Sequence, residues 1–496
     1  MRVMAIQNKV KIDKWAEGSG AGNPSEVREY GNAPGICPGA EVGGLDEGAT
    51  AGILRNIWIN SWPVLGVMLL NFVVGYTDVY VAGMLSPDVQ AVVGFISQLY
   101  FILIILGNAL GVGTVALVSS SVGRCEWGQA FDFTRQSLVM AASIGAILAV
   151  LSFAGAGEII LQFSLPEAIR GMALVYLKIV SFAMLPNYII ILMSAVFRAA
   201  GQPLIPFRVM GVVTVLNVAS SFGLALGLGP LPRLGYRGIA TATAISMLAG
   251  MLLVATVLFG RKWRGVWEGS WKPRTSIIRS ILRISWPAAV LQLAWNAGSL
   301  ALYQFLGKLG TASITAMAAY ANGLRMESIT YLPAFALNMA AAVLVGQSLG
   351  AGSVERARRY GWQTAAAGTV VLSLFAALLA HFAPRLAGML TEDPAVKAET
   401  IRYLYFNLAA APLMVFSVVL GGAMQGAGDT MGVMKIIVFA IWIVRIPLAA
   451  FFCFTLGFGA TGVWGAMFCS LTLQGALMTW KYWRGGWIAA AIAKKA

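Results

Sequence analysis

The sequence predicts an all-α membrane protein with about twelve transmembrane helices, arranged as two repeated six-helix halves. Hydrophobic residues make up 58% of the 496 residues and charged residues only 11%. A soluble domain carries about 25% charged residues, so too little polar surface is available here for a soluble fold. Apolar runs of roughly twenty residues recur along the chain, which is the length that one membrane-spanning helix needs. These runs are too long for the strands of a membrane barrel, which leaves helices as the spanning elements.

The chain order predicts two helical bundles joined by a linker. Residues 1–52 are polar and are predicted to form a flexible cytoplasmic tail, because no continuous apolar core of a signal peptide is present. The N-terminal six-helix bundle is expected over 53–260, with helices near 57–84, 89–119, 131–154, 171–199, 206–228 and 236–259. A basic cytoplasmic linker follows at 261–280. The C-terminal six-helix bundle is expected over 281–484, before a cytoplasmic tail at 485–496, with helices near 281–307, 313–348, 360–383, 398–425, 433–457 and 460–483.

The basic residues of the loops predict the orientation. The net charge is +15, but Lys and Arg are spread over many loops rather than gathered in one domain, so no nucleic-acid partner is expected. With the N-terminus inside, the inner loops and tail hold nineteen basic residues and the outer loops hold eight. Because positive loops stay in the cytoplasm, both termini are predicted to be cytoplasmic in a multi-pass plasma-membrane protein.

The two halves repeat in sequence. A shift of 227 residues pairs identical residues from position 117 to position 201, including Tyr176 with Tyr403 and Gly201 with Gly428. Six is an even number of helices, so both halves run in the same direction and are related by an axis along the membrane normal. Repeats of this kind place a ligand site near the midplane, between the halves.

Several motifs in order resemble the multidrug and toxic compound extrusion (MATE) family. The most recognisable is the run LVGQSLGAG at 344–352. Others that are similar to the family lie at 62–63, 78–83, 325–328, 333–335, 425–430, 442–448 and 462–464. The resemblance covers nearly all of residues 57–487. It implies two six-helix bundles in a V around a cavity, and secondary active export of hydrophobic, often cationic organic compounds in exchange for protons or sodium ions.

Asp78 is the foremost candidate for a cation-coupling residue. It lies within the first apolar run, where an ionised side chain costs about 2.5–3.5 kcal/mol and therefore suggests function. Asn71 shares its face at helical spacing, and the fifth-helix residues Asn217 and Ser221 and the sixth-helix residue Thr243 could support the site. Many family members have an aspartate where Ser221 stands, so a site with two carboxylates is in doubt. The alternatives are a carboxylate that reaches the aqueous boundary and small residues that only pack helices.

The second half offers a cavity wall and a reserve acid. Glu327 is the reserve coupling residue, with a structural ion pair to a nearby arginine as its alternative. The glutamate and aspartate that the sodium-coupled branch of the family has on its seventh and tenth helices are missing, which favours protons over sodium. The residues predicted to line a substrate cavity, with hydrogen bonding between helices as the alternative, are Gln292, Asn296, Tyr303, Tyr331 and Asn338.

Two prolines occupy matching places in the halves. Pro63 and Pro287 each remove a backbone hydrogen bond inside an apolar run, which predicts a hinge or a fixed bend.

Enzyme chemistry is not indicated. No GxxxxGK[ST] run is present, so ATP hydrolysis is not expected. Only one histidine occurs and the four cysteines show no CxxC spacing, so no metal site is expected, and no other cofactor is indicated. The predicted protein is an antiporter that acts as a monomer on small organic molecules within the lipid bilayer. The alternatives are a flippase for a lipid-linked saccharide and a membrane receptor or scaffold that transports nothing.

Overall fold

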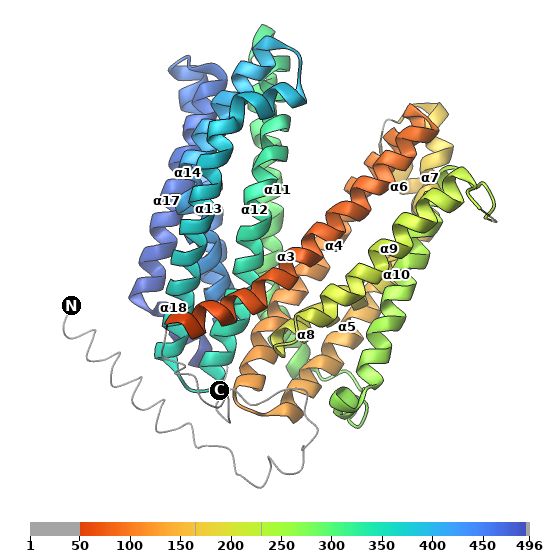
Figure 1. The fold of residues 1–496 in the computed structure, drawn as a ribbon, viewed down its shortest axis with the longest axis vertical. Coiled ribbons are helices and arrows are strands. Elements are labelled where there is room, and N and C mark those ends of the chain that lie inside the picture. The colour runs from red at the N-terminus through yellow and green to blue at the C-terminus, as the bar shows by residue number, and fades with distance from the viewer. Residues whose placement is uncertain (1–49, 164, 230, 493–496) are drawn as a thin grey trace. The chain divides into compact units, whose positions relative to one another are not determined.

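A computed structural model describes residues 50–163, 165–229 and 231–492, and these residues form helices joined by short connections (Figure 1). Ten of the described helices are long and apolar enough to cross a membrane, or eleven when one bent pair is taken as a single span. The last long helix, Gly459–Arg484, has the length of a span but is not among these ten. The predicted tail over 1–52 lies outside the described residues except for its last three, which begin the first helix.

The first half follows the predicted order of helices. The first span begins seven residues before its predicted start, the limits of the other spans lie within four residues of prediction, and one short helix, α6, was not predicted. The elements are α3 (Thr50–Leu85), α4 (Pro87–Gly123), α5 (Trp127–Ala154), α6 (Ala156–Leu161), α7 (Glu167–Ser181), α8 (Met184–Ala199), α9 (Leu204–Leu226) and α10 (Tyr236–Phe259). The short helix η1 (Arg261–Val266) follows α10 in the linker.

The second half repeats this pattern. Its elements are α11 (Thr275–Gly307), η2 (Gly310–Ala312), α12 (Ser313–Gly350), α13 (Val354–Leu390), α14 (Pro394–Ala427), α15 (Thr430–Val438), η3 (Phe439–Arg445), α16 (Ile446–Ala450), η4 (Phe451–Thr455), α17 (Gly459–Arg484) and α18 (Gly486–Ile492). The predicted C-terminal tail thus begins with a helix, whose Trp487 stacks on Tyr482 at 4.8 Å between ring centroids.

Two spans are less regular than the sequence predicts. The single helix expected over 171–199 is broken between α7 and α8, which meet at a bend of 47°. The helix expected over 433–457 contains the π-helical segments η3 and η4 on either side of α16. Pro447 lies in α16 and has no N–H to give to the preceding turn, which explains irregular winding at this point.

Packing divides the described chain into two compact units. We call residues 62–285 the N-terminal unit, and residues 50–61 with 286–492 the C-terminal unit. The boundaries fall inside α3 and inside α11, one residue before Pro63 and one residue before Pro287. The start of α3 therefore packs with the second half of the chain, where Ile53 and Ile57 join the core and Asn56 donates to the Tyr360 hydroxyl at 2.9 Å.

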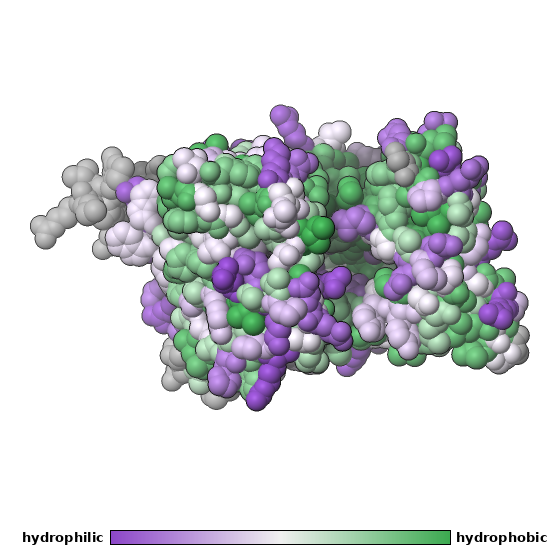
Figure 2. Space-filling view, turned by 90° about the horizontal axis from the view of Figure 1, so that it is seen from above, coloured by the Kyte–Doolittle hydropathy of each residue, from purple (hydrophilic) through white to green (hydrophobic). Residues whose placement is uncertain are grey.

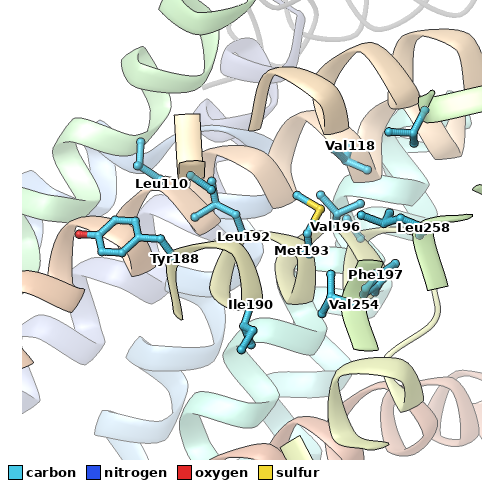
Figure 3. Packing of buried hydrophobic residues seen from close by; sticks show 14 of the residues in the cluster. Leu110, Val118, Tyr188, Ile190, Leu192, Met193, Val196, Phe197, Val254 and Leu258 are labelled. Carbon is cyan, nitrogen blue, oxygen red and sulfur yellow. The ribbon is translucent and has the colours of Figure 1, made fainter. Parts of the chain in front are cut away.

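Each unit has its own apolar core. In the N-terminal unit, side chains of α4, α8 and α10 such as Val118, Leu192 and Leu258 interdigitate (Figure 3). Because lipid is as apolar as these side chains, close helix contact at small residues contributes much of the stability. A Cβ at Gly238 of α10 would lie 2.5 Å from the carbonyl carbon of Leu224 in α9. At this point the two backbones touch, which holds α9 and α10 together.

Large apolar side chains remain exposed along the spans, including Phe72, Val215 and Leu300, as expected for helices that face lipid. The view of one end of the molecule shows hydrophilic side chains among the helix ends and loops, with hydrophobic residues between them (Figure 2). The exposed apolar side chains along the spans fit a protein that lies across a bilayer.

Candidate functional site: a buried carboxylate in each unit

Asp78 lies in the interior of the N-terminal unit, where hydroxyl groups from two other helices bind it. Its exposure is 8% although it belongs to a membrane-spanning helix. The Ser221 hydroxyl of α9 donates to Asp78 Oδ1 at 3.1 Å, and the Thr243 hydroxyl of α10 donates to Oδ2 at 3.2 Å. Both carboxylate oxygens are thus hydrogen-bonded, as a buried charge requires.

The local helix geometry explains how these groups meet. Asn217 and Ser221 are four residues apart, so they lie on the same face of α9. Asn217 Nδ2 lies 3.5 Å from Thr243 Oγ1, which links α9 to α10 beside the carboxylate. The close approach of the two backbones at Gly238 brings these faces within reach of each other.

Two further groups complete the surroundings of Asp78. Tyr176 of α7 is buried near enough for its hydroxyl to interact electrostatically with the carboxylate. Asn217 is fully buried, and its Oδ1 has no hydrogen-bond partner among the described residues. The site thus gathers oxygens from a carboxylate, two hydroxyls and one amide, a set that can carry a proton or surround a small hard cation.

Asn71 is not part of this cluster. Its side chain is exposed and donates to the Val67 carbonyl of its own helix at 2.9 Å. The spacing of seven residues from Asp78 brings it to the same side of an ideal helix, but almost two turns away along the axis.

Glu327 is the buried acid of the C-terminal unit, with an exposure of 8%. The Tyr403 hydroxyl of α14 donates to Glu327 Oε2 at 2.6 Å, and Asn407 Nδ2 donates to that hydroxyl at 3.0 Å. Tyr331, one turn further along α12, also hydrogen-bonds Glu327. The carboxylate is therefore held by neutral donors from two helices.

Arg445 lies close enough to Glu327 to interact with it electrostatically, but the described residues contain no direct ion pair between the two. Arg445 is 5% exposed, and its Nε donates to Ser470 Oγ at 2.8 Å. Its Nη2 has no partner within the described part of the chain. Arg325, two residues from Glu327, is exposed and points to another side of α12, since residues two apart on a helix do not face each other.

The predicted cavity residues are spread over the C-terminal unit. Gln292 and Asn296 are half-buried, and Asn296 donates to the Gln292 carbonyl at 2.8 Å. Tyr303 is half-buried and packs edge-on against Tyr320 at 4.7 Å. Asn338 donates to the Val418 carbonyl at 2.6 Å and so bridges α12 and α14.

Sequence reasoning named Tyr331 but did not connect Tyr176 or Tyr403 with the two acids, although a signal for them existed. Tyr176 and Tyr403 are matched by the 227-residue repeat, and each lies beside the buried acid of its own unit. The acids themselves lie at positions that do not match in the repeat. The match of a tyrosine at equivalent positions of both halves could therefore have indicated a residue of the site. No such match in the repeat marks Asn407.

Comparison with known proteins identifies the family. The family model described as MatE matches residues 63–222 and 287–451, which together are more than half of the chain. The chain belongs to the MATE family. It is a member of a transporter family, not of an enzyme family, and a multi-pass membrane protein.

Relatives and solved structures agree with this assignment. The chain is 26% identical over 439 residues to the "Probable multidrug resistance protein NorM" of Thermotoga maritima, covering 87% of this chain and 92% of the relative. It is 28% identical over 440 residues to the "Multidrug resistance protein NorM" of Burkholderia vietnamiensis, with 85% and 91% covered. The structure of a MATE protein in the bent conformation matches with a TM-score of 0.80 at 19% identity, covering 90% of this chain and 98% of that one. The protein therefore has the MATE fold and is related to multidrug resistance transporters.

Proposed function

We propose that this protein is an antiporter that exports hydrophobic, often cationic organic compounds in exchange for protons. The observation that supports the proposal most directly is the Asp78 carboxylate, buried in a membrane span and hydrogen-bonded from two other helices. An ionisable group at this depth is costly, and it is usually kept for ion or substrate transport. The related NorM proteins are named as multidrug resistance proteins, which supports organic compounds as the cargo.

The proposed cycle exchanges one charge for another at Asp78. The ionised carboxylate attracts an organic cation, and protonation from outside removes that charge and frees the compound. Protonation also changes the hydrogen bonds to Ser221 and Thr243, so it can alter how α3 packs on α9 and α10. The available energy is about 2.3 kcal/mol per charge per 100 mV and about 1.4 kcal/mol per pH unit.

Protons are preferred to sodium because the Asp78 site contains a single carboxylate, with Ser221 where the resemblance to the family implies a second acid in many members. A sodium ion in a dry site gains most when more than one oxygen ligand is anionic. Asn217 Oδ1, which has no hydrogen-bond partner among the described residues, would be an additional ligand for a metal ion, so the experiment varies the two ions separately.

The test is efflux of a cationic dye, ethidium, from vesicles under separately imposed pH and sodium gradients. We expect a pH gradient alone to drive efflux by the wild type, and Asp78→Asn to reduce the rate at least tenfold. Asp88→Asn is the matched control, because Asp88 is an exposed acid only ten residues away, and it should leave efflux unchanged. Unchanged efflux by Asp78→Asn would reject the role of Asp78, and efflux driven only by sodium would reject proton coupling.

We also propose that both termini are cytoplasmic and that the protein acts as a monomer. The excess of basic residues in the predicted inner loops supports the orientation. The internal repeat supports the monomer, because one chain already contains both halves that a transporter of this kind needs.

A further inference from the structure

The linker between α10 and α11 and the start of α11 are strongly basic. Residues 261–283 contain one acid, Glu268, and the basic residues Arg261, Lys262, Arg264, Lys272, Arg274, Arg279 and Arg283. All seven basic residues are exposed. The simplest interpretation of such a charge run is a solvated loop that fixes membrane orientation. A binding role for the linker needs support from its contacts in the folded chain.

The linker is not a loose loop, because the start of α5 fixes it by polar contacts. Gln136 of α5 donates to the Lys272 carbonyl at 3.0 Å and accepts from the Arg274 N–H at 3.0 Å. Arg135 of α5 donates to the Gly265 carbonyl at 3.0 Å. These contacts hold residues 265–274 in one position on the N-terminal unit.

Aromatic contacts fix the same segment and place it near the end of a membrane span. Trp263 is 2% exposed and packs edge-on against Phe197 at 5.1 Å. Trp267 stacks on Phe259, the last residue of α10, at 4.4 Å, and Trp271 packs on Trp267 at 5.1 Å. Tryptophans at the end of a span mark the level of the lipid headgroups. The linker thus lies at this level, at the lower end of α10 in Figure 1.

The first turns of α11 continue the surface. Ile281 and Ile284 are buried in the core of the N-terminal unit. Arg279 and Arg283, four residues apart, share the exposed face. Leu282 and Trp286 are 43% and 47% exposed, so this part of the helix also shows apolar surface beside its charges. Long basic side chains beside apolar surface are typical of the boundary between lipid and water.

Most of these charges have no acidic partner among the residues that the structure describes. Arg264 pairs with Glu268 at 3.2 Å, and Arg274 pairs with Asp132 at 2.9 Å. The described part of the chain offers no ion pair to the remaining five, which we call the basic platform: Arg261, Lys262, Lys272, Arg279 and Arg283. Five cations at headgroup depth, with no ion pair among the described residues, can attract anions at the membrane surface.

We propose that the basic platform binds the headgroups of anionic phospholipids in the leaflet that it faces. Clusters of four to eight basic residues next to a membrane span attract anionic lipid, each residue contributing about fivefold in affinity. An orientation signal acts on the chain during insertion and needs only the number of charges. It does not require the contacts of Arg135 and Gln136, which hold the linker backbone at Gly265 and Lys272 against the N-terminal unit and so keep the linker close to the membrane surface.

The test measures binding of fluorescent phosphatidylglycerol to the purified full-length protein in neutral detergent. The test variant is R261Q/K262Q/K272Q/R279Q/R283Q. The matched control, R170Q/R233Q/R237Q/K308Q/R385Q, removes five exposed basic residues elsewhere. A third variant keeps the charges by replacing Arg261, Arg279 and Arg283 with Lys. We expect the test variant to bind at least a hundredfold more weakly, and the control and the charge-retaining variant to bind within threefold of the wild type.

Competition identifies the ligand, and the wild type alone suffices if the test variant does not fold. Unlabelled phosphatidylglycerol should displace the probe, whereas phosphatidylcholine and free glycerol phosphate at equal concentration should not. Displacement by glycerol phosphate would reveal a site for free anions and overturn the proposal. Equal displacement by phosphatidylcholine, equal weakening in the control variant, or displacement by RNA at nanomolar concentration would overturn it as well.

Discussion

At the scale of single residues, the described part of each unit of this MATE protein contains one buried acid, and the groups that hydrogen-bond the acid differ between the two units. Asp78 is bound by two hydroxyls that are themselves neutral and small. Glu327 is bound by the phenol of Tyr403, with Arg445 nearby but not in contact through an ion pair. Tyrosines that match in the repeat stand beside both acids, whereas Asp78 and Glu327 lie at positions that do not match.

Removing the Tyr403 hydroxyl should destabilise the C-terminal unit. Tyr403→Phe leaves Glu327 Oε2 without its donor and Asn407 without its acceptor. Hydrogen bonds to charged groups contribute about 1.5–3 kcal/mol in water-soluble proteins and interhelical bonds in membranes average about 0.6, so we expect a loss of about 1–2 kcal/mol. Unfolding of purified protein by heat or denaturant measures it.

Tyr405→Phe is the control for this change, because Tyr405 lies on the same helix with an exposure of 49%. It should alter stability by less than about 0.5 kcal/mol. Equal stability of the Tyr403 and Tyr405 variants would show that the hydroxyl does not hold Glu327.

At the scale of the elements, the close approach of helix backbones decides the packing. A Cβ at Gly426 of α14 would overlap the Ala342 carbonyl of α12. Neighbouring Gly422 faces the Asn338 carbonyl of α12 in the same way. Glycines four residues apart thus form a smooth strip on α14 that lets α12 approach, as small residues do in membrane helices.

Replacing a glycine of this strip should lower the free energy of unfolding even when the new side chain is only a methyl group. Gly426→Ala forces α12 and α14 apart, and overpacking of this kind costs about 1–3 kcal/mol. Gly211→Ala in α9 is the control, since its Cβ meets nothing within 4 Å, and it should be neutral or stabilising by up to about 1 kcal/mol. Thermal unfolding of both variants gives the comparison, and a neutral Gly426→Ala would contradict the packing described here.

The prolines also act at this scale, and their role stays a prediction. Pro63 and Pro287 lie inside α3 and α11, next to the places where each helix passes from one compact unit to the other. A missing hydrogen bond at such a boundary weakens the helix where bending would do least damage to either core.

At the scale of the whole molecule, the orientation in the membrane follows from charge. The basic linker and both termini are predicted on the cytoplasmic side. Single cysteines test this in a variant whose four native cysteines are replaced by serine. Ser270→Cys in the linker should react with a membrane-impermeant thiol reagent only after cells are opened, and Glu392→Cys should react in intact cells.

Both positions are exposed, so burial does not prevent the reaction. The opposite pattern of labelling would reverse the orientation and with it the direction of transport that we propose. Labelling of both positions in intact cells would show that the chain inserts in two orientations.

The sequence by itself determined the class of the protein, the order of its helices and the identity of its family. Long apolar runs in lipid form helices, because every backbone N–H and C=O group must be hydrogen-bonded within its own segment. The predicted limits of α9, α10 and α12 therefore agree with the structure to within two residues. The bend between α7 and α8 escaped prediction, since α7 and α8 were both apolar enough to be read as one helix.

Only the tertiary structure decided which polar residues meet. Asp78, Ser221 and Thr243 are brought together by the packing of three helices, and so are Glu327 and Tyr403 of α12 and α14. Helical spacing predicts the face on which a residue lies but not which face of another helix will cover it, which is why Asn71 was grouped with Asp78 and lies apart from it. The linker shows the same limit, because its charges can be counted in the sequence while the contacts of Arg135 and Gln136 that hold its backbone exist only in the folded chain.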